Sequence, residues 1–155
     1  MTTGGSATDL LRGDHRRVRE LLAELAATTR ADAKRRVELV ARIKREMLLH
    51  ATLEEEIFYP VFRESADTEH GRMFREAHEE HRAIEKLVLP DLETTDAGSD
   101  EFRGRAKVLR HLVEHHAAEE EREMFPRAER ALTDVELERV AARIEQRKVE
   151  LVELM

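Results

Sequence analysis

The sequence predicts an all-α protein, an up-down-up-down four-helix bundle with an additional C-terminal helix. The composition combines 41% hydrophobic with 39% charged residues, a balance that is typical of long amphipathic helices. Aromatic residues make up 4% of the 155 residues, and there are only 6 glycines and 3 prolines, which disfavours an all-β fold. Apolar residues also recur with the helical period of about 3.6 residues in five segments that short connections join.

The first two predicted helices cover residues 7–28 and 32–58. Ser6 and Asp9 have the spacing of a capping box at the start of the first helix. Pro60 follows the second helix, and we expect this helix to stop or kink there because proline lacks an N–H donor and its ring clashes with the preceding turn.

The third and fourth predicted helices cover residues 68–89 and 101–124, and they end close to Pro90 and Pro126 for the same reason. A segment rich in turn-forming residues, 91–100, separates them.

The fifth predicted helix covers residues 134–154 and opens with a capping box, Thr133 and Glu136. Because four helices of similar length already complete a bundle, we divide the chain into a bundle over residues 7–130 and a C-terminal helix over residues 131–155. This helix packs on the bundle or forms a dimer interface, so a monomer or a homodimer is expected.

Charge and composition exclude several classes of function. The formal net charge is −7 and no face is uniformly basic, so we expect no nucleic-acid partner. No apolar run approaches the ~18 residues of a transmembrane helix, and the first residues lack the apolar stretch of a signal peptide, so a soluble cytoplasmic protein is expected. The chain has no cysteine, which excludes disulfides, thiolate catalysis and iron–sulfur or cysteine–zinc sites.

The first four helices each carry a histidine in phase with the apolar residues of that helix. These histidines are His15, His50, His81 and His116. A glutamate follows two of them by four residues, Glu54 and Glu120, so that each pair shares one helix face. A buried carboxylate is costly unless it is paired or bound to a metal. One such histidine alone is usually a hydrogen-bonded core residue, but the set predicts a metal site.

A metal site whose ligands are imidazole nitrogens and carboxylate oxygens, with no sulfur, suits iron, manganese or zinc. Two carboxylates can bridge two metal ions about 3.5–4 Å apart, so a two-metal centre is predicted. His78 lies one turn before His81, and we expect it to be a fifth histidine ligand. His115 and Glu119 also have i,i+4 spacing, but they are one residue out of phase with the apolar stripe, so we favour the pair that begins at His116.

Tyr59 is the single tyrosine and lies just past the turn that holds Glu54. It is either a packing residue at a helix end or a phenol near the metals that hydrogen-bonds or ligates. Glu55 is expected to be solvated or to support a ligand rather than to bind the metal itself. No catalytic residue is assigned.

An internal repeat relates the second helix to the fourth. His50, Glu54, Glu55 and Pro60 match His116, Glu120, Glu121 and Pro126 in spacing. The repeat predicts that the two helices pair around a pseudo-two-fold axis.

Together these motifs resemble those of hemerythrin-like proteins, the HHE cation-binding domain family, from about Leu10 to Pro126. The motifs in this chain are Asp14-His15, His50-x-x-x-Glu54, His78-x-x-His81 and His116-x-x-x-Glu120. The resemblance implies a four-helix bundle that holds two non-haem iron ions, oxo- or hydroxo-bridged, with terminal histidine ligands and with Glu54 and Glu120 as bridges. The histidine spacing of three on the third helix, and the glutamate four residues after His116, depart from the oxygen-carrying hemerythrins. Both departures look like the bacterial and mycobacterial hemerythrin-like branch.

The resemblance implies a function in which the centre binds O2, senses oxygen or iron, or decomposes peroxide as a catalase-like enzyme would. Iron rests on the resemblance, because the ligand types alone also permit manganese or zinc. Two alternatives stay open: a metal-binding module for iron storage or sensing, and a metal-independent helical interaction module that uses the fifth helix for docking.

Overall fold

The computed structural model describes residues 6–65 and 68–155. The described chain is helical and contains no strand, and none of its helices is long and apolar enough to cross a membrane. The α-helices are α1 (Ala7–Ala26), α2 (Ala33–Leu53), α3 (Tyr59–Glu64), α4 (Thr68–Ala83), α5 (Leu89–Glu93), α6 (Asp100–Glu119), α7 (Phe125–Ala131) and α8 (Asp134–Leu154). A short 3-10 helix, η1 (Arg30–Asp32), precedes α2, and three segments are π-helical: η2 (Glu54–Phe58), η3 (Ile84–Val88) and η4 (Glu120–Met124).

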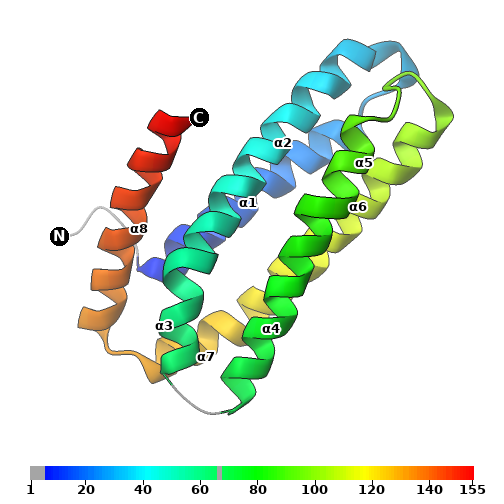
Figure 1. Ribbon diagram of the computed structural model, residues 1–155. Helices are drawn as coiled ribbons and strands as arrows, with labels where there is room; N and C mark the ends of the chain where they lie inside the picture. The colour runs from blue at the N-terminus through cyan, green and yellow to red at the C-terminus, as the bar shows by residue number, and fades with distance from the viewer. Residues whose placement is uncertain (1–5, 66–67) are drawn as a thin grey trace.

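Four antiparallel rods form the bundle (Figure 1). The first rod is α1, and the other three are composite: α2–η2–α3, α4–η3–α5 and α6–η4–α7. The first rod packs against α2 and α6, and the third rod packs against the second and the fourth, so consecutive rods are neighbours. The predicted up-down-up-down bundle with an additional C-terminal helix is therefore confirmed.

The third and fourth helices do not end near Pro90 and Pro126 as predicted, and the second helix does not stop at Pro60. Each composite rod passes through its proline and continues as α3, α5 or α7. One residue before each proline, the N–H donates to the carbonyl five residues back: Tyr59 to Glu54, Leu89 to Ile84 and Phe125 to Glu120. The extra residue in the turn gives the proline room, since its ring and its missing N–H do not fit a regular α-turn. Two of these wide turns begin at the predicted ligands Glu54 and Glu120.

Both predicted capping boxes are present. The Ser6 hydroxyl accepts from the Asp9 N–H while the Asp9 carboxylate accepts from the Ser6 N–H. Thr133 and Glu136 make the same reciprocal pair at the start of α8. The caps satisfy backbone donors that the first turn of each helix would otherwise leave without a partner.

The buried apolar side chains form two clusters, and the histidines lie between them. On α1, His15 separates Leu11 of one cluster from Val18 of the other. The histidines at 50, 81 and 116 interrupt their own helices in the same way. The bundle therefore consists of two apolar layers with one polar layer between them.

The C-terminal helix α8 packs against α1, α2 and η2, along one side of the bundle (Figure 1). It adds Leu137, Val140 and Ile144 to the apolar cluster that contains Phe58 and Phe125. This contact enlarges the apolar cluster on one side of the polar layer.

Truncation of one α8 side chain tests this packing. Ile144 is 2% exposed, so Ile144→Ala should lower the free energy of unfolding by about 2–5 kcal/mol through lost burial and a residual cavity. The measurement is urea denaturation followed by far-ultraviolet circular dichroism. Val149 lies on the same helix but is 61% exposed, and Val149→Ala should change the free energy by less than about 0.5 kcal/mol. Equal effects would show that α8 does not pack as described.

Candidate metal centre

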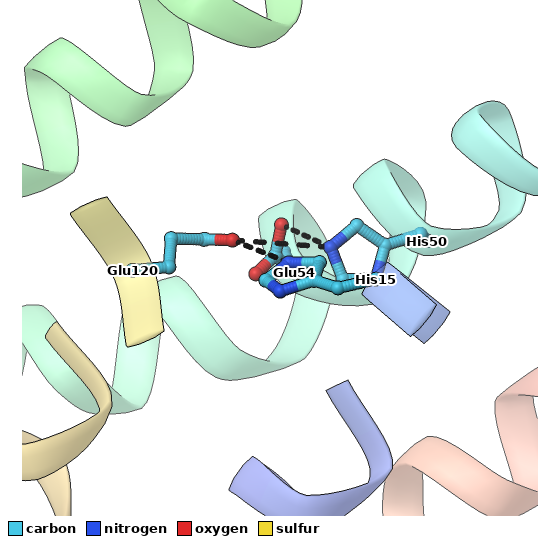
Figure 2. A group of neighbouring side chains, drawn as sticks. All are labelled: His15, His50, Glu54 and Glu120. Carbon is cyan, nitrogen blue, oxygen red and sulfur yellow. Dashed lines mark hydrogen bonds and ion pairs between the residues drawn. The ribbon is translucent and has the colours of Figure 1, made fainter. Parts of the chain in front are cut away.

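The polar layer brings together four histidines and two glutamates from all four rods. They are His15, His50, Glu54, His81, His116 and Glu120, and all six are buried. Inside the layer, Nε2 of His15 lies 3.0 Å from Glu120 Oε1, and Nε2 of His81 lies 3.1 Å from Glu54 Oε1. Figure 2 shows the side chains of His15, His50, Glu54 and Glu120 converging on one point. The imidazole and carboxylate donors thus face a common centre.

The donor atoms form two overlapping groups, and within each group all atoms lie within 4.8 Å of one another. One group is His15, His50, Glu54 and Glu120, and the other is Glu54, His81 and His116. Glu54 belongs to both groups, and Glu120 Oε1 also lies 3.2 Å from His116 Nε2. Each group can hold one metal ion, with carboxylates placed between the two positions.

The outer nitrogen of every histidine in the layer bonds to a carboxylate on a neighbouring rod. The Nδ1 pairs are His50 with Asp14 at 2.9 Å, His81 with Glu55 at 2.9 Å, His116 with Glu80 at 2.7 Å and His15 with Glu121 at 2.8 Å. Since an ionised carboxylate can only accept, each Nδ1 donates to its carboxylate, and the neutral form of each imidazole then has its lone pair at Nε2, toward the centre. This carboxylate–imidazole arrangement is the one that surrounds histidine-bound metals in proteins.

The charges in the layer are strongly coupled. Burial by itself lowers the pKa of His50 and His116, but the facing carboxylates raise both pKa values well above the ordinary value. Burial opposes the charge of Glu120 as well, but His116 and His15 lower the pKa of this carboxylate well below its usual range. The cluster therefore attracts positive charge, as protons on the imidazoles or as a cation in their place.

Two further observations indicate that the residues of the layer fit a metal ion. Glu54 Oε2 is buried and makes no hydrogen bond within the described residues, and His50 Nε2 lies 2.9 Å from Glu54 Oε1 without the geometry of a hydrogen bond. Buried polar atoms of this kind are rare and costly. Carboxylates also outnumber imidazoles in and around the layer, so neutral imidazoles leave an excess of buried negative charge. A cation between the carboxylates would satisfy both atoms and balance the charge.

The phenol of Tyr59 enters the layer from the start of α3. Its hydroxyl donates to Glu120 Oε2 at 2.6 Å and also lies 3.2 Å from Glu54 Oε1. The ring stacks on His81, with 5.4 Å between ring centroids. Burial, together with the two carboxylates, raises the pKa of Tyr59 well above its ordinary value, so the hydroxyl keeps its proton.

The structure does not bring every predicted ligand into the layer. The His78 side chain is 54% exposed, and its Nδ1 lies 2.9 Å from Glu55 Oε1, on the outer side of the carboxylate that holds His81. Helical phase does not keep His78 from the centre, since residues three apart lie only about 60° apart around the helix axis. Its exposed side chain lies outside the layer, one turn before His81. On α6, His115 is 62% exposed and lies outside the layer, whereas His116 and Glu120 lie inside it.

Three of the four carboxylates that hold the histidines have no role predicted from the sequence. For the fourth, Glu55, the prediction was a side chain that is solvated or supports a ligand. Asp14 and Glu80 directly precede His15 and His81, while Glu55 and Glu121 directly follow the central glutamates. In the sequence, the signal for these carboxylates was that an acidic residue stands directly beside a motif histidine or glutamate. Each acid holds a histidine of another rod, and that pairing appears only once the rods are assembled.

Comparisons with known proteins agree with the cluster. A family model described as the hemerythrin HHE cation binding domain matches residues 6–128. Among solved structures, the fold is similar to that of a hemerythrin HHE cation binding domain-containing protein from Mycobacterium kansasii, with a TM-score of 0.79 and 24% identity over 97% of this chain and 91% of that chain. The chain is also 28% identical over 120 residues to a DNA nickase from Nostoc sp.. That match covers 76% of this chain but only 32% of the nickase, so the chain spans a minor part of this relative's length.

Two neighbouring histidines on α6 provide a matched test of the cluster. His116→Ala should lower the amount of metal that the purified protein retains at least by half, because it removes a donor from the layer. His115→Ala should retain as much metal as the unmodified protein, because this side chain is mostly exposed. Both variants are loaded with Fe²⁺ without oxygen, desalted and analysed by mass spectrometry for metal per chain. Equal metal retention by the two variants would contradict the assignment of the layer as the metal centre.

Proposed function

The chain belongs to the hemerythrin HHE cation-binding domain family, and on that premise we propose that its buried layer holds two iron ions and reacts with a small oxygen species, O2 or peroxide. The observation that carries this proposal is the pair of donor groups that share Glu54. In the proposal, the four histidines would hold the ions through Nε2, and Glu54 and Glu120 would supply carboxylate oxygens to both. His78 is not a ligand in this scheme but a hydrogen-bond partner of Glu55.

Iron held in this layer would supply the Lewis acidity and the electrons for chemistry on a small oxygen species. The chain itself provides the surroundings. Apolar side chains lie on both sides of the layer, including Ile43 on one side and Phe58 on the other, and they keep bulk water away. The carboxylates at Nδ1 fix the orientation of each imidazole. Such enclosure favours a small, uncharged or weakly charged substrate.

Tyr59 favours peroxide decomposition over simple oxygen carriage. Its hydroxyl carries a proton at Oη within 3.2 Å of both bridging carboxylates, where a proton donor is of use in cleaving an O–O bond. In the repeated half of the bundle the equivalent residue is Phe125, which stacks on His15 as Tyr59 stacks on His81. The proton donor is therefore present on one side of the centre. The overall reaction proposed converts two H2O2 into O2 and two H2O.

The first experiment is metal analysis and optical spectroscopy of protein purified from iron-supplied cells, followed by addition of O2 and then of peroxide. About two irons per chain are expected, with O2 released from peroxide and measured at an oxygen electrode. A reversible spectral change with O2 and no turnover of peroxide would indicate an oxygen-binding or sensing protein instead. A well-folded chain that takes up no metal would favour the alternative function, a metal-independent helical interaction module.

Tyr59→Phe tests the role of the phenol. The substitution keeps the ring and its stacking on His81 but removes the hydroxyl, so the rate of O2 release per bound iron should fall about 10-fold or more. Iron content and thermal unfolding are measured in parallel, so that a loss of metal is separated from a loss of proton donation. Phe125→Tyr is a useful companion variant, because it adds a phenol to the other half of the repeat. An unchanged rate in Tyr59→Phe would exclude the phenol from the reaction.

A further inference from the structure

A cavity of about 380 Å³ between α4 and α6–η4 extends to the buried layer. Its walls include Met73, Ala77 and Met124, which are buried apolar residues. Glu120 also lines the cavity, although only 2% of this residue is exposed. Because Glu120 belongs to one of the two donor groups, the cavity reaches a residue of the candidate metal centre.

The side chains around this cavity are mainly acidic. Besides Glu120 they include Glu76, Glu80, Glu119 and Glu123, against the exposed His115 and a single arginine, Arg72. Arg72 pairs with Glu76 at 2.9 Å, which leaves Glu123 as the acid at the mouth without a cationic partner among the described residues. Glu80 connects the two ends of the passage, since one carboxylate oxygen lies 2.7 Å from buried His116 Nδ1 and the other 3.3 Å from His115 Nε2. A passage with this charge concentrates cations and repels anions.

Two other sides of the layer, those of His15 and His50, are less suited to a cation. On the side of His15, Glu121 is covered by Arg19, whose guanidinium bridges Glu114 and Glu121. On the side of His50, Asp14 is only 8% exposed and lies beside Lys148 of α8. A cation that approached on either side would meet a positive side chain before it met the cluster.

We propose that the cavity between α4 and α6–η4 is the route by which the divalent metal ion reaches the buried layer. Glu76 and Glu123 attract the ion at the mouth, and Glu120 receives it at the inner end. The inference rests on the proposed metal-binding function, but it concerns the rate of loading and not the stability of the loaded site.

Tyr59 makes the rate of loading measurable. It is the single tyrosine of a chain without tryptophan, and its hydroxyl contacts both central glutamates, so a bound paramagnetic ion should quench its fluorescence. Apoprotein is mixed with Co²⁺ in a stopped-flow instrument and the quenching is followed in time. The double variant Glu76→Gln/Glu123→Gln should load about 10-fold more slowly at low salt, and the difference should shrink as salt rises. The final metal content should equal that of the unmodified protein.

A control variant removes the same charge elsewhere. Glu38 and Glu145 are exposed on α2 and α8, away from the cavity, and Glu38→Gln/Glu145→Gln should load at nearly the unmodified rate. A third variant, Glu123→Lys, should slow loading to a similar extent, because it changes the charge at the mouth by the same two units with one substitution. Equal loading rates in all variants, with full metal content, would overturn the route and leave the metal centre intact. A chain that binds no Co²⁺ and no Fe²⁺ at all would overturn the proposed function itself.

Discussion

Four hydrogen bonds between imidazoles and carboxylates join the rods of the bundle into a closed ring. Asp14 of α1 holds His50 of α2, Glu55 of η2 holds His81 of α4, Glu80 of α4 holds His116 of α6, and Glu121 of η4 holds His15 of α1. Each bond links one rod to the next, and the last bond returns to the first rod. The ring therefore fixes both the mutual register of the rods and the direction in which each Nε2 points.

This ring sets the register because misalignment is costly. If one rod slid by a turn, an imidazole would lose its carboxylate while the imidazole itself remained buried, and a buried polar group left without its partner costs about 1–3 kcal/mol. The apolar layers on either side distinguish the correct register from a shifted one less sharply, since aliphatic side chains can repack against one another. The wide turns that begin at Glu54 and Glu120 belong to the same arrangement, because the prolines that follow them require an extra residue in the turn.

The periodicity of the sequence was sufficient to predict the bundle and the six residues that meet in its polar layer, since a histidine in phase with leucines and valines must point to the core. It was not sufficient for His78, because helical phase alone places a residue three positions from His81 near the edge of the same face. The prolines misled the prediction of helix ends for a related reason: a π turn has no distinctive composition, and its cost is met by tertiary packing. The carboxylate partners of the histidines could not be predicted from the sequence, because each pair joins residues of different rods.

The repeat makes the two halves of the layer similar, and the surroundings make them different. Asp14 and Glu80 occupy equivalent positions before a histidine, but Asp14 is covered by α8 and Glu80 is 28% exposed at the wall of a cavity. Tyr59 and Phe125 are likewise equivalent, and only Tyr59 carries a hydroxyl. The carboxylate that holds His50 is thus covered, while the one that holds His116 lines a cavity, and the hydroxyl of Tyr59 lies beside His81. A pseudo-symmetric scaffold of this kind can bind two similar ions and still direct loading and chemistry to one side of the pair.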